Sequence, residues 1–123
     1  MFRIVIYILV VCGLVLGVSP AAGQESSAVF VLVHGAFQDS SGWEQLKTTL
    51  EESGNTVVTV QAAGRGTDTT PLNEITLTAY RDAVVDAITA QTEPVILVGH
   101  SFGGMVISSV AEIVPDKIHA LVY

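Results

Sequence analysis

The stretch from Gly99 to Gly103 reads Gly-His-Ser-Phe-Gly, a Gly-x-Ser-x-Gly pattern centred on Ser101. A serine between small residues fits a sharp strand-to-helix turn, because the backbone passes close to itself on both sides of the serine. Such a turn raises the hydroxyl above the sheet edge, where it can attack a carbonyl carbon. The alternative is an inert serine in a glycine-rich turn. An apolar run before the pattern and a helical pattern after it favour the nucleophile.

Acyl transfer also needs a base, a group that orients the base, and hydrogen-bond donors for the oxyanion. The donors that we expect are the backbone N–H groups of Phe102, directly after the serine, and of Ala36, in the loop after an earlier strand. Both loops follow the carboxyl ends of parallel strands, which is the edge where open α/β sheets bind ligands. Gly99, Gly103 and Gly35 are expected to set the geometry of the turn and of the loop.

None of the 3 histidines is predicted to be the general base. His100 adjoins Ser101, and consecutive side chains at a sharp turn point in different directions. His34 is interpreted as a histidine that bonds to loop backbone and holds its turn. His119 opens the last predicted strand and is interpreted as a surface residue. The candidates for the orienting acid all fall in loops or on helices: Asp39, Asp68, Asp82, Asp86 and Asp116.

Apolar strands alternate with amphipathic helices along the chain, which predicts an α/β fold with a parallel sheet and flanking helices. The expected strands are continuous apolar or β-branched runs at 29–33, 56–60, 95–98 and 118–123. The expected helices span about 42–53, 76–91 and 102–113, and a long loop covers 61–73.

Local signals refine the ends and faces of these helices. Ser41 and Glu44 have the spacing of a capping box for the first helix, and Gly54 suits its C-terminal end. The third helix is predicted to turn four apolar side chains toward the core: Met105, Val106, Val110 and Ile113.

The N-terminus has the layout of a secretory signal peptide. Arg3 precedes an uncharged apolar run, Ile4–Val18, and small residues suited to cleavage follow it. The run is shorter than the about 20 residues that a membrane-spanning helix needs. We therefore expect residues 1–23 to be removed by cleavage after Ala21 or Gly23. The mature protein would then be secreted or periplasmic, without a stable membrane anchor.

The composition limits the possible classes of function. A length of 123 residues suits at most one domain, here expected at 24–123. The net charge of −7 argues against nucleic acid as a partner. Because the single cysteine, Cys12, lies in the apolar run, the mature chain has no disulfide framework and no thiolate zinc site. No pattern indicates the oligomeric state.

Together, these residues resemble a known family. The chain is similar to the N-terminal half of an α/β-hydrolase, and in particular to the small esterases related to plant methylesterases and hydroxynitrile lyases. The matching stretches cover nearly all of the expected mature chain: Phe30–Phe37, Trp43–Leu46, Leu77–Tyr80, Val95–Gly104 and Pro115–Ile118.

The resemblance implies a serine hydrolase acting on small carboxylic esters. Ser101 would be the nucleophile, Ala36 and Phe102 the oxyanion donors, and no metal or cofactor would be needed. Lyases of this family carry a threonine at the position of Gly35, so the glycine favours the esterase branch.

Members of the family also carry a cap segment and further strands with the catalytic Asp and His after the strand that begins near Ile118. We therefore expect this chain to be a fragment, truncated after the start of that strand, and alone at best a very poor catalyst. Two alternatives stay open. One is a cofactor-free lyase or C–C hydrolase of the same fold, and the other is a non-catalytic ligand-binding or inactive truncated protein.

Overall fold

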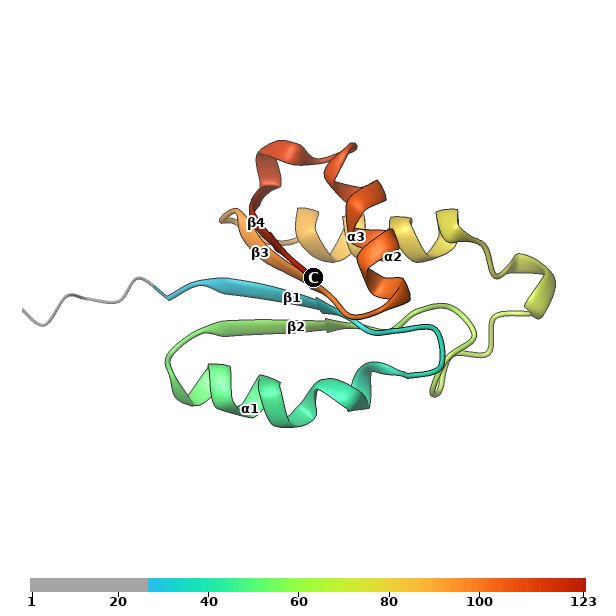
Figure 1. The fold of residues 1–123 in the computed structure, drawn as a ribbon, viewed down its shortest axis with the longest axis horizontal. Coiled ribbons are helices and arrows are strands. Elements are labelled where there is room, and N and C mark those ends of the chain that lie inside the picture. The colour runs from blue at the N-terminus through green and yellow to red at the C-terminus, as the bar shows by residue number, and fades with distance from the viewer. Residues whose placement is uncertain (1–26) are drawn as a thin grey trace, which may run out of the picture.

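The computed structural model describes residues 27–123, which form a four-stranded parallel sheet flanked by helices (Figure 1). The strands are β1 (Val29–Val33), β2 (Thr56–Val60), β3 (Val95–Gly99) and β4 (Ile118–Val122). The helices are α1 (Glu44–Glu52), α2 (Leu77–Thr89) and α3 (Phe102–Ala111). The predicted α/β fold with a parallel sheet is confirmed. The predicted signal peptide lies outside the described residues and stays a prediction.

The strand order β2-β1-β3-β4 makes β1 and β3 neighbours in the middle of the sheet. Their register pairs Val33, the last residue of β1, with Gly99, the last residue of β3. Both strands therefore end at the same level. The loop that follows β1 and the turn that follows β3 consequently lie next to each other at the carboxyl edge of the sheet.

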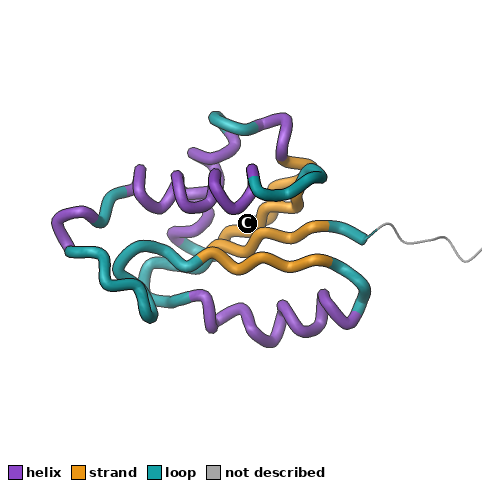
Figure 2. The backbone as a smooth tube through the Cα atoms, turned by 180° about the vertical axis from the view of Figure 1, so that it is seen from behind, coloured by secondary structure: helices purple, strands orange, loops and turns teal. Residues whose placement is uncertain are grey.

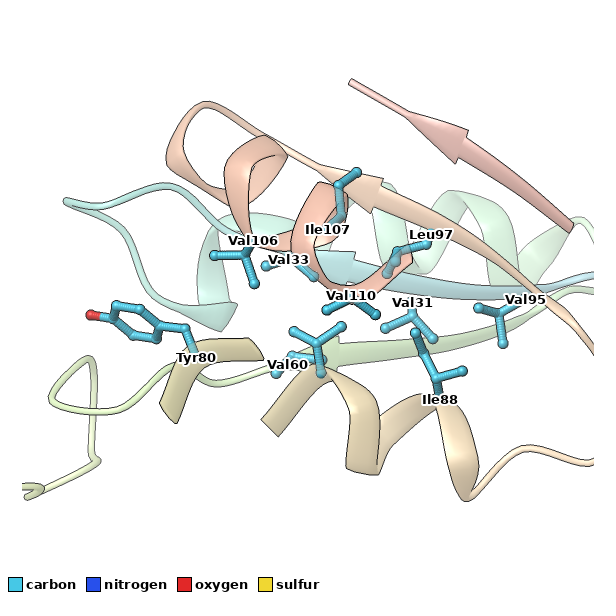
Figure 3. Packing of buried hydrophobic residues seen from close by; sticks show 11 residues of the cluster. Val31, Val33, Val60, Tyr80, Ile88, Val95, Leu97, Val106, Ile107 and Val110 are labelled. Atoms are coloured by element: carbon cyan, nitrogen blue, oxygen red, sulfur yellow. The ribbon is translucent and has the colours of Figure 1, made fainter. Parts of the chain in front are cut away.

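The helices lie on opposite faces of the sheet, with α1 on one side and α2 and α3 on the other (Figure 1); Figure 2 shows the same layering from behind. The core lies between the sheet and the α2–α3 layer, where strand and helix side chains point toward one another (Figure 3). Val31, Leu97, Ile88 and Val110 are fully buried there. In contrast, α1 buries none of its residues completely. The helix that follows β3, α3, thus lies on the well-packed side of the sheet.

The predicted capping box at the start of the first helix is wrong. The chain first forms a 3-10 helix, Ser40–Trp43, and α1 begins only at Glu44. The N-cap of the 3-10 helix is Asp39, whose Oδ1 accepts hydrogen bonds from the Ser41 N–H at 2.8 Å and from the Ser41 hydroxyl. The hydroxyl bond and then the backbone bond lower the pKa of the Asp39 carboxyl. A short acidic side chain that bonds to the backbone two residues on competes directly with a serine cap.

The predicted inner face of α3 is partly wrong. Val106 and Val110 are buried as expected, but Met105 is 59% exposed and Ile113 is 48% exposed. The helix ends at Ala111, so Ile113 lies beyond it. The helix itself carries apolar residues on most of its sides, so the spacing of its apolar residues does not identify the face that points to the core. In the structure, the close approach of the helix to β1 at its N-terminal end orients it instead.

Gly54, in contrast, ends α1 as predicted: its φ of +85° is in the left-handed region that favours glycine. The loop predicted at 61–73 is also present, and a short 3-10 helix, Leu72–Glu74, begins at its end.

Thr76 is the N-cap of α2, and its hydroxyl accepts a hydrogen bond from the Ala79 N–H at 3.0 Å. We expect Thr76→Ala to lower the free energy of unfolding by about 1 kcal/mol, because that N–H loses its acceptor. Thr78→Ala is the matched control, since Thr78 lies exposed on the same helix. It should change stability by less than about 0.5 kcal/mol. Urea unfolding measures both variants, and equal losses would contradict the capping role.

Candidate active site

Ser101 stands at the junction between β3 and α3 in a conformation that side chains rarely adopt. Its φ is +56° and its ψ is −121°, and no other non-glycine residue of 27–123 has a positive φ. The residue is exposed to solvent. Backbone strain of this kind persists only where the surrounding structure enforces it, and it is concentrated at functional sites. The turn thus has the geometry of a nucleophile elbow.

Two glycines make this turn possible. A Cβ atom built on Gly99 would lie 2.7 Å from the carbonyl carbon and oxygen of Gly103. A Cβ atom on Gly103 would lie 2.5 Å from the carbonyl oxygen of Val33, at the end of β1. Both contacts are with backbone, which cannot swing away as a flexible side chain can. The two positions are therefore closed to every side chain, and α3 begins in direct contact with the central strand.

The loop after β1 meets the elbow at Gly35. A Cβ atom on Gly35 would lie 3.3 Å from Cβ of Ser101, so the glycine leaves space beside the serine. The His100 N–H donates to the carbonyl oxygen of Val33 at 3.0 Å and links the elbow to the end of β1. The structure thus brings Gly35 and Ser101 together, although they are far apart in the sequence.

The two residues expected to supply oxyanion donors, Ala36 and Phe102, line the same pocket. Phe102 is the first residue of α3, so its N–H has no acceptor within the helix. Within 27–123, the Ala36 N–H also has no protein acceptor. Ala36 and Phe102 both line a narrow, mostly apolar pocket, together with Val33, His34, Gly35, Val60, Ala62, Tyr80, Val84 and Val106. Its volume of about 10 Å³ has room for roughly one water molecule.

His34 is buried, and both of its ring nitrogens are occupied. Nε2 accepts a hydrogen bond from the Ala62 N–H at 3.2 Å. Nδ1 must then carry the hydrogen, and it donates to the carbonyl oxygen of Gly35 at 2.9 Å. These bonds tie the loop after β1 to the loop after β2. His34 holds the loop, as its sequence position suggests, and has no free lone pair with which to take a proton from Ser101.

The other two histidines of the chain are not placed as a base either. His100 Nδ1 lies 2.9 Å from Oε1 of Gln38. The His100 and Trp43 rings are nearly perpendicular, with their centroids 6.5 Å apart. His119 lies exposed on β4, which is an edge strand of the sheet. In the described part of the chain, no histidine or carboxylate is hydrogen-bonded to the Ser101 hydroxyl.

Three of the five candidate acids have side-chain partners away from the elbow. Asp39 caps the 3-10 helix, and Asp82 pairs with Arg81 at 2.8 Å. Asp68 accepts from the N–H groups of Gly64 and Thr70, and hydrogen bonds from these two residues lower the pKa of its carboxyl. Sequence reasoning also missed one residue at the site, Gln38, which contacts both the loop and the elbow. No local pattern marks it.

Two general features of residues 27–123 bear on the kinds of site that they form. No group of three or more His, Cys, Asp or Glu side chains in this part of the chain is arranged to hold a metal ion. No helix within these residues combines the length and the apolar character needed to cross a membrane.

Comparison with known proteins relates this geometry to a family. A family model described as the alpha/beta hydrolase family matches residues 30–123. The α-hydroxynitrile lyase of Arabidopsis thaliana is 39% identical over 97 residues, which cover 76% of this chain and 38% of the relative. Salicylic acid-binding protein 2 of Nicotiana tabacum is 40% identical over 97 residues, covering 76% of this chain and 37% of the relative.

Among solved structures, an extracellular α/β-hydrolase from a Paenibacillus species superposes with a TM-score of 0.69 at 38% sequence identity. The match covers 76% of this chain and 38% of that protein. The chain spans about two fifths of the length of the curated relatives it matches. The family match, residues 30–123, includes all four strands and all three α-helices of the described structure except Val29, the first residue of β1.

Proposed function

The chain belongs to the α/β-hydrolase family, and from this premise we propose that it carries the nucleophile of a serine hydrolase for small carboxylic esters. The observation that carries the proposal is the conformation of Ser101. The residue is exposed and strained at a strand-to-helix turn, beside two backbone N–H groups without protein acceptors. Esterases among the similar proteins, such as polyneuridine aldehyde esterase of Rauvolfia serpentina, support the choice of substrate class.

In the proposed reaction, Oγ of Ser101 attacks the ester carbonyl carbon while its proton passes to a base. The carbonyl oxygen becomes an oxyanion and accepts hydrogen bonds from the Ala36 and Phe102 N–H groups. One such donor is worth about 3 kcal/mol in the transition state. Collapse of the intermediate breaks the C–O bond, and the departing alkoxide takes the proton from the base. Water then releases the acid from the acyl-serine by the same steps.

The base and the acid that orients it are not supplied by the described residues, so the proposal assigns them to a part of the protein outside 27–123. Catalysis by the described residues alone would lack proton transfer, which contributes roughly 10²–10⁴-fold to rate. The proposal therefore applies to the protein as it is produced in its source, together with the part that carries the base and the acid.

The test begins with the intact mass of the protein made from its native locus. That protein is then treated with a fluorophosphonate probe and with a short p-nitrophenyl ester, and the labelled peptide is identified by mass spectrometry. We expect the label on Ser101 and hydrolysis of the ester. A folded protein that takes up no label would contradict the proposal and favour a non-catalytic ligand-binding role.

A lyase of the same fold is the second candidate, because an α-hydroxynitrile lyase matches about as well as the esterases do. The geometry at Gly35 favours ester hydrolysis. A side chain there would begin 3.3 Å from Cβ of Ser101 and would crowd the nucleophile, and the threonine expected at this position in lyases of the family is absent. A panel of esters and cyanohydrins separates the candidates. Cleavage of cyanohydrins without hydrolysis of any ester would overturn the esterase proposal.

We also propose that the protein is secreted or periplasmic, on the basis of the signal-like sequence at residues 1–23. The intact mass tests this as well, since the secreted protein should lack the residues up to Ala21 or Gly23. A product that retains Met1 and stays in the cytoplasm would contradict it.

A further inference from the structure

The side chain of Gln38 joins the loop after β1 to the elbow after β3. Its Oε1 accepts a hydrogen bond from the Gly35 N–H at 3.3 Å and lies 2.9 Å from Nδ1 of His100. The Gly35 N–H can only donate, so the atom that faces it must be the amide oxygen. Nδ1 of His100 must therefore carry a hydrogen and donate to the same oxygen. One oxygen atom thus holds two segments that are distant in the sequence.

The surrounding contacts fix this bridge in place. The Gln38 N–H donates to the Gly35 carbonyl oxygen at 3.2 Å and closes the turn that brings the side chain back over Gly35. A Cβ atom on Gly35 would lie 3.2 Å from both Gln38 Oε1 and His100 Nδ1, so the bridge fills the space above the glycine. On its other side, the His100 ring rests edge-on against Trp43.

The bridge joins residues that lie one and two positions before the two expected oxyanion donors. Gly35 is followed by Ala36, and His100 is followed by Ser101 and then Phe102. The two donors stand on different segments, so their separation depends on whatever links those segments. An oxyanion donor acts only when it lies about 2.7–3.1 Å from the developing charge. A displacement of about 1 Å can cost roughly 100-fold in rate.

We propose that Gln38 is a positioning residue for the proposed ester hydrolysis. Its side chain holds His100 against the Gly35–Ala36 loop, so that the N–H groups of Ala36 and Phe102 face the same oxyanion. The inference rests on the proposed function. In this inference, His100 acts as a brace, by which we mean a hydrogen-bond donor that links the elbow to the loop after β1, and not as a base.

The first test compares Gln38→Met with Gln61→Met. Gln61 is a matched control, because its Oε1 also accepts two hydrogen bonds, from Ser40 N–H at 3.1 Å and Ser40 Oγ at 2.8 Å. It contacts neither Gly35 nor His100. Gln38 is exposed and water can partly replace it, so we expect Gln38→Met to lower kcat for a p-nitrophenyl ester by about tenfold with KM nearly unchanged. Gln61→Met should stay within about twofold, and Gln38→Glu, which keeps the acceptor oxygen, should recover most of the loss.

The second test separates a brace from a base at His100. His100→Asn keeps an N–H donor close to the position of Nδ1, whereas His100→Leu removes it. We expect the asparagine variant to retain most of the wild-type kcat and the leucine variant to lose about tenfold. Equal and nearly complete loss in both variants would overturn the brace and indicate direct proton transfer.

A third measurement does not depend on turnover. Amide hydrogen exchange at Gly35 and Ala36 should become faster in Gln38→Met and stay unchanged in Gln61→Met. A wild-type protein that does not react at Ser101 would overturn the proposed function. A reactive wild type with an equally reactive Gln38→Met and unchanged exchange would overturn this inference alone.

Discussion

Replacing Gly103 with alanine is expected to lower the free energy of unfolding by about 3 kcal/mol. The new methyl group would lie 2.5 Å from the carbonyl oxygen of Val33 and 2.9 Å from that of His34. Both atoms belong to the backbone at the end of β1, in the centre of the sheet. The clash can be relieved only if α3 moves away from the strand, which opens the core beneath Val106 and Val110.

Gly104→Ala is the matched control, because both glycines are buried in the first turn of the same helix. The nearest atom to its Cβ would be in the Tyr123 ring, at 3.2 Å, and that side chain is 73% exposed and can shift. Alanine is also a better helix former than glycine, by about 1 kcal/mol. We expect Gly104→Ala to change stability by less than about 1 kcal/mol.

Urea unfolding followed by circular dichroism distinguishes the two variants. Fluorophosphonate labelling gives a second measure, since a displaced α3 also carries the Phe102 N–H away from the pocket. We expect Gly103→Ala to be labelled much more slowly than Gly104→Ala. If the two alanines cost the same stability, the close approach of Gly103 to β1 cannot be what fixes the elbow.

The strands could be predicted because strands buried on both faces of a parallel sheet are continuous apolar runs. Val29–Val33 and Thr56–Val60 have the predicted bounds, and β3 extends by only one residue, to Gly99. The orientation of α3 could not be predicted, because it depends on the contact of Gly103 with the carbonyl oxygen of Val33. Such a contact follows from strand pairing, which the local sequence does not contain.

In the candidate site, too, features set by the local sequence could be predicted, and features set by strand pairing could not. Ser101 and its flanking glycines form a continuous segment, so the local sequence is enough to predict the sharp turn at the serine. The bond of His34 to the Gly35 carbonyl oxygen agrees with its predicted role of holding its own loop, whereas its bond to the Ala62 N–H depends on the pairing of β1 with β2. The role of Gln38 depends on the pairing of β1 with β3, which alone brings His100 within 2.9 Å of it. Sequence spacing between these two residues carries no such information.

Ser101→Gly is expected to make the protein more stable while it abolishes covalent labelling. A side chain at a φ of +56° and a ψ of −121° costs about 1–3 kcal/mol, and glycine adopts this conformation without strain. Glycine also gains roughly 0.5–1 kcal/mol of conformational freedom in the unfolded chain, which offsets part of the relief. The expected net gain is about 1 kcal/mol.

Ser101→Ala is the comparison that isolates the strain. Alanine keeps Cβ, and with it the strained backbone, so its stability should stay within about 0.5 kcal/mol of the wild type. Both variants lack the hydroxyl and should take up no fluorophosphonate label. Urea unfolding compares the two, and a glycine variant no more stable than the alanine variant would contradict the strain. Gain of stability with loss of the nucleophile is expected where a fold maintains an unfavourable conformation for the sake of chemistry.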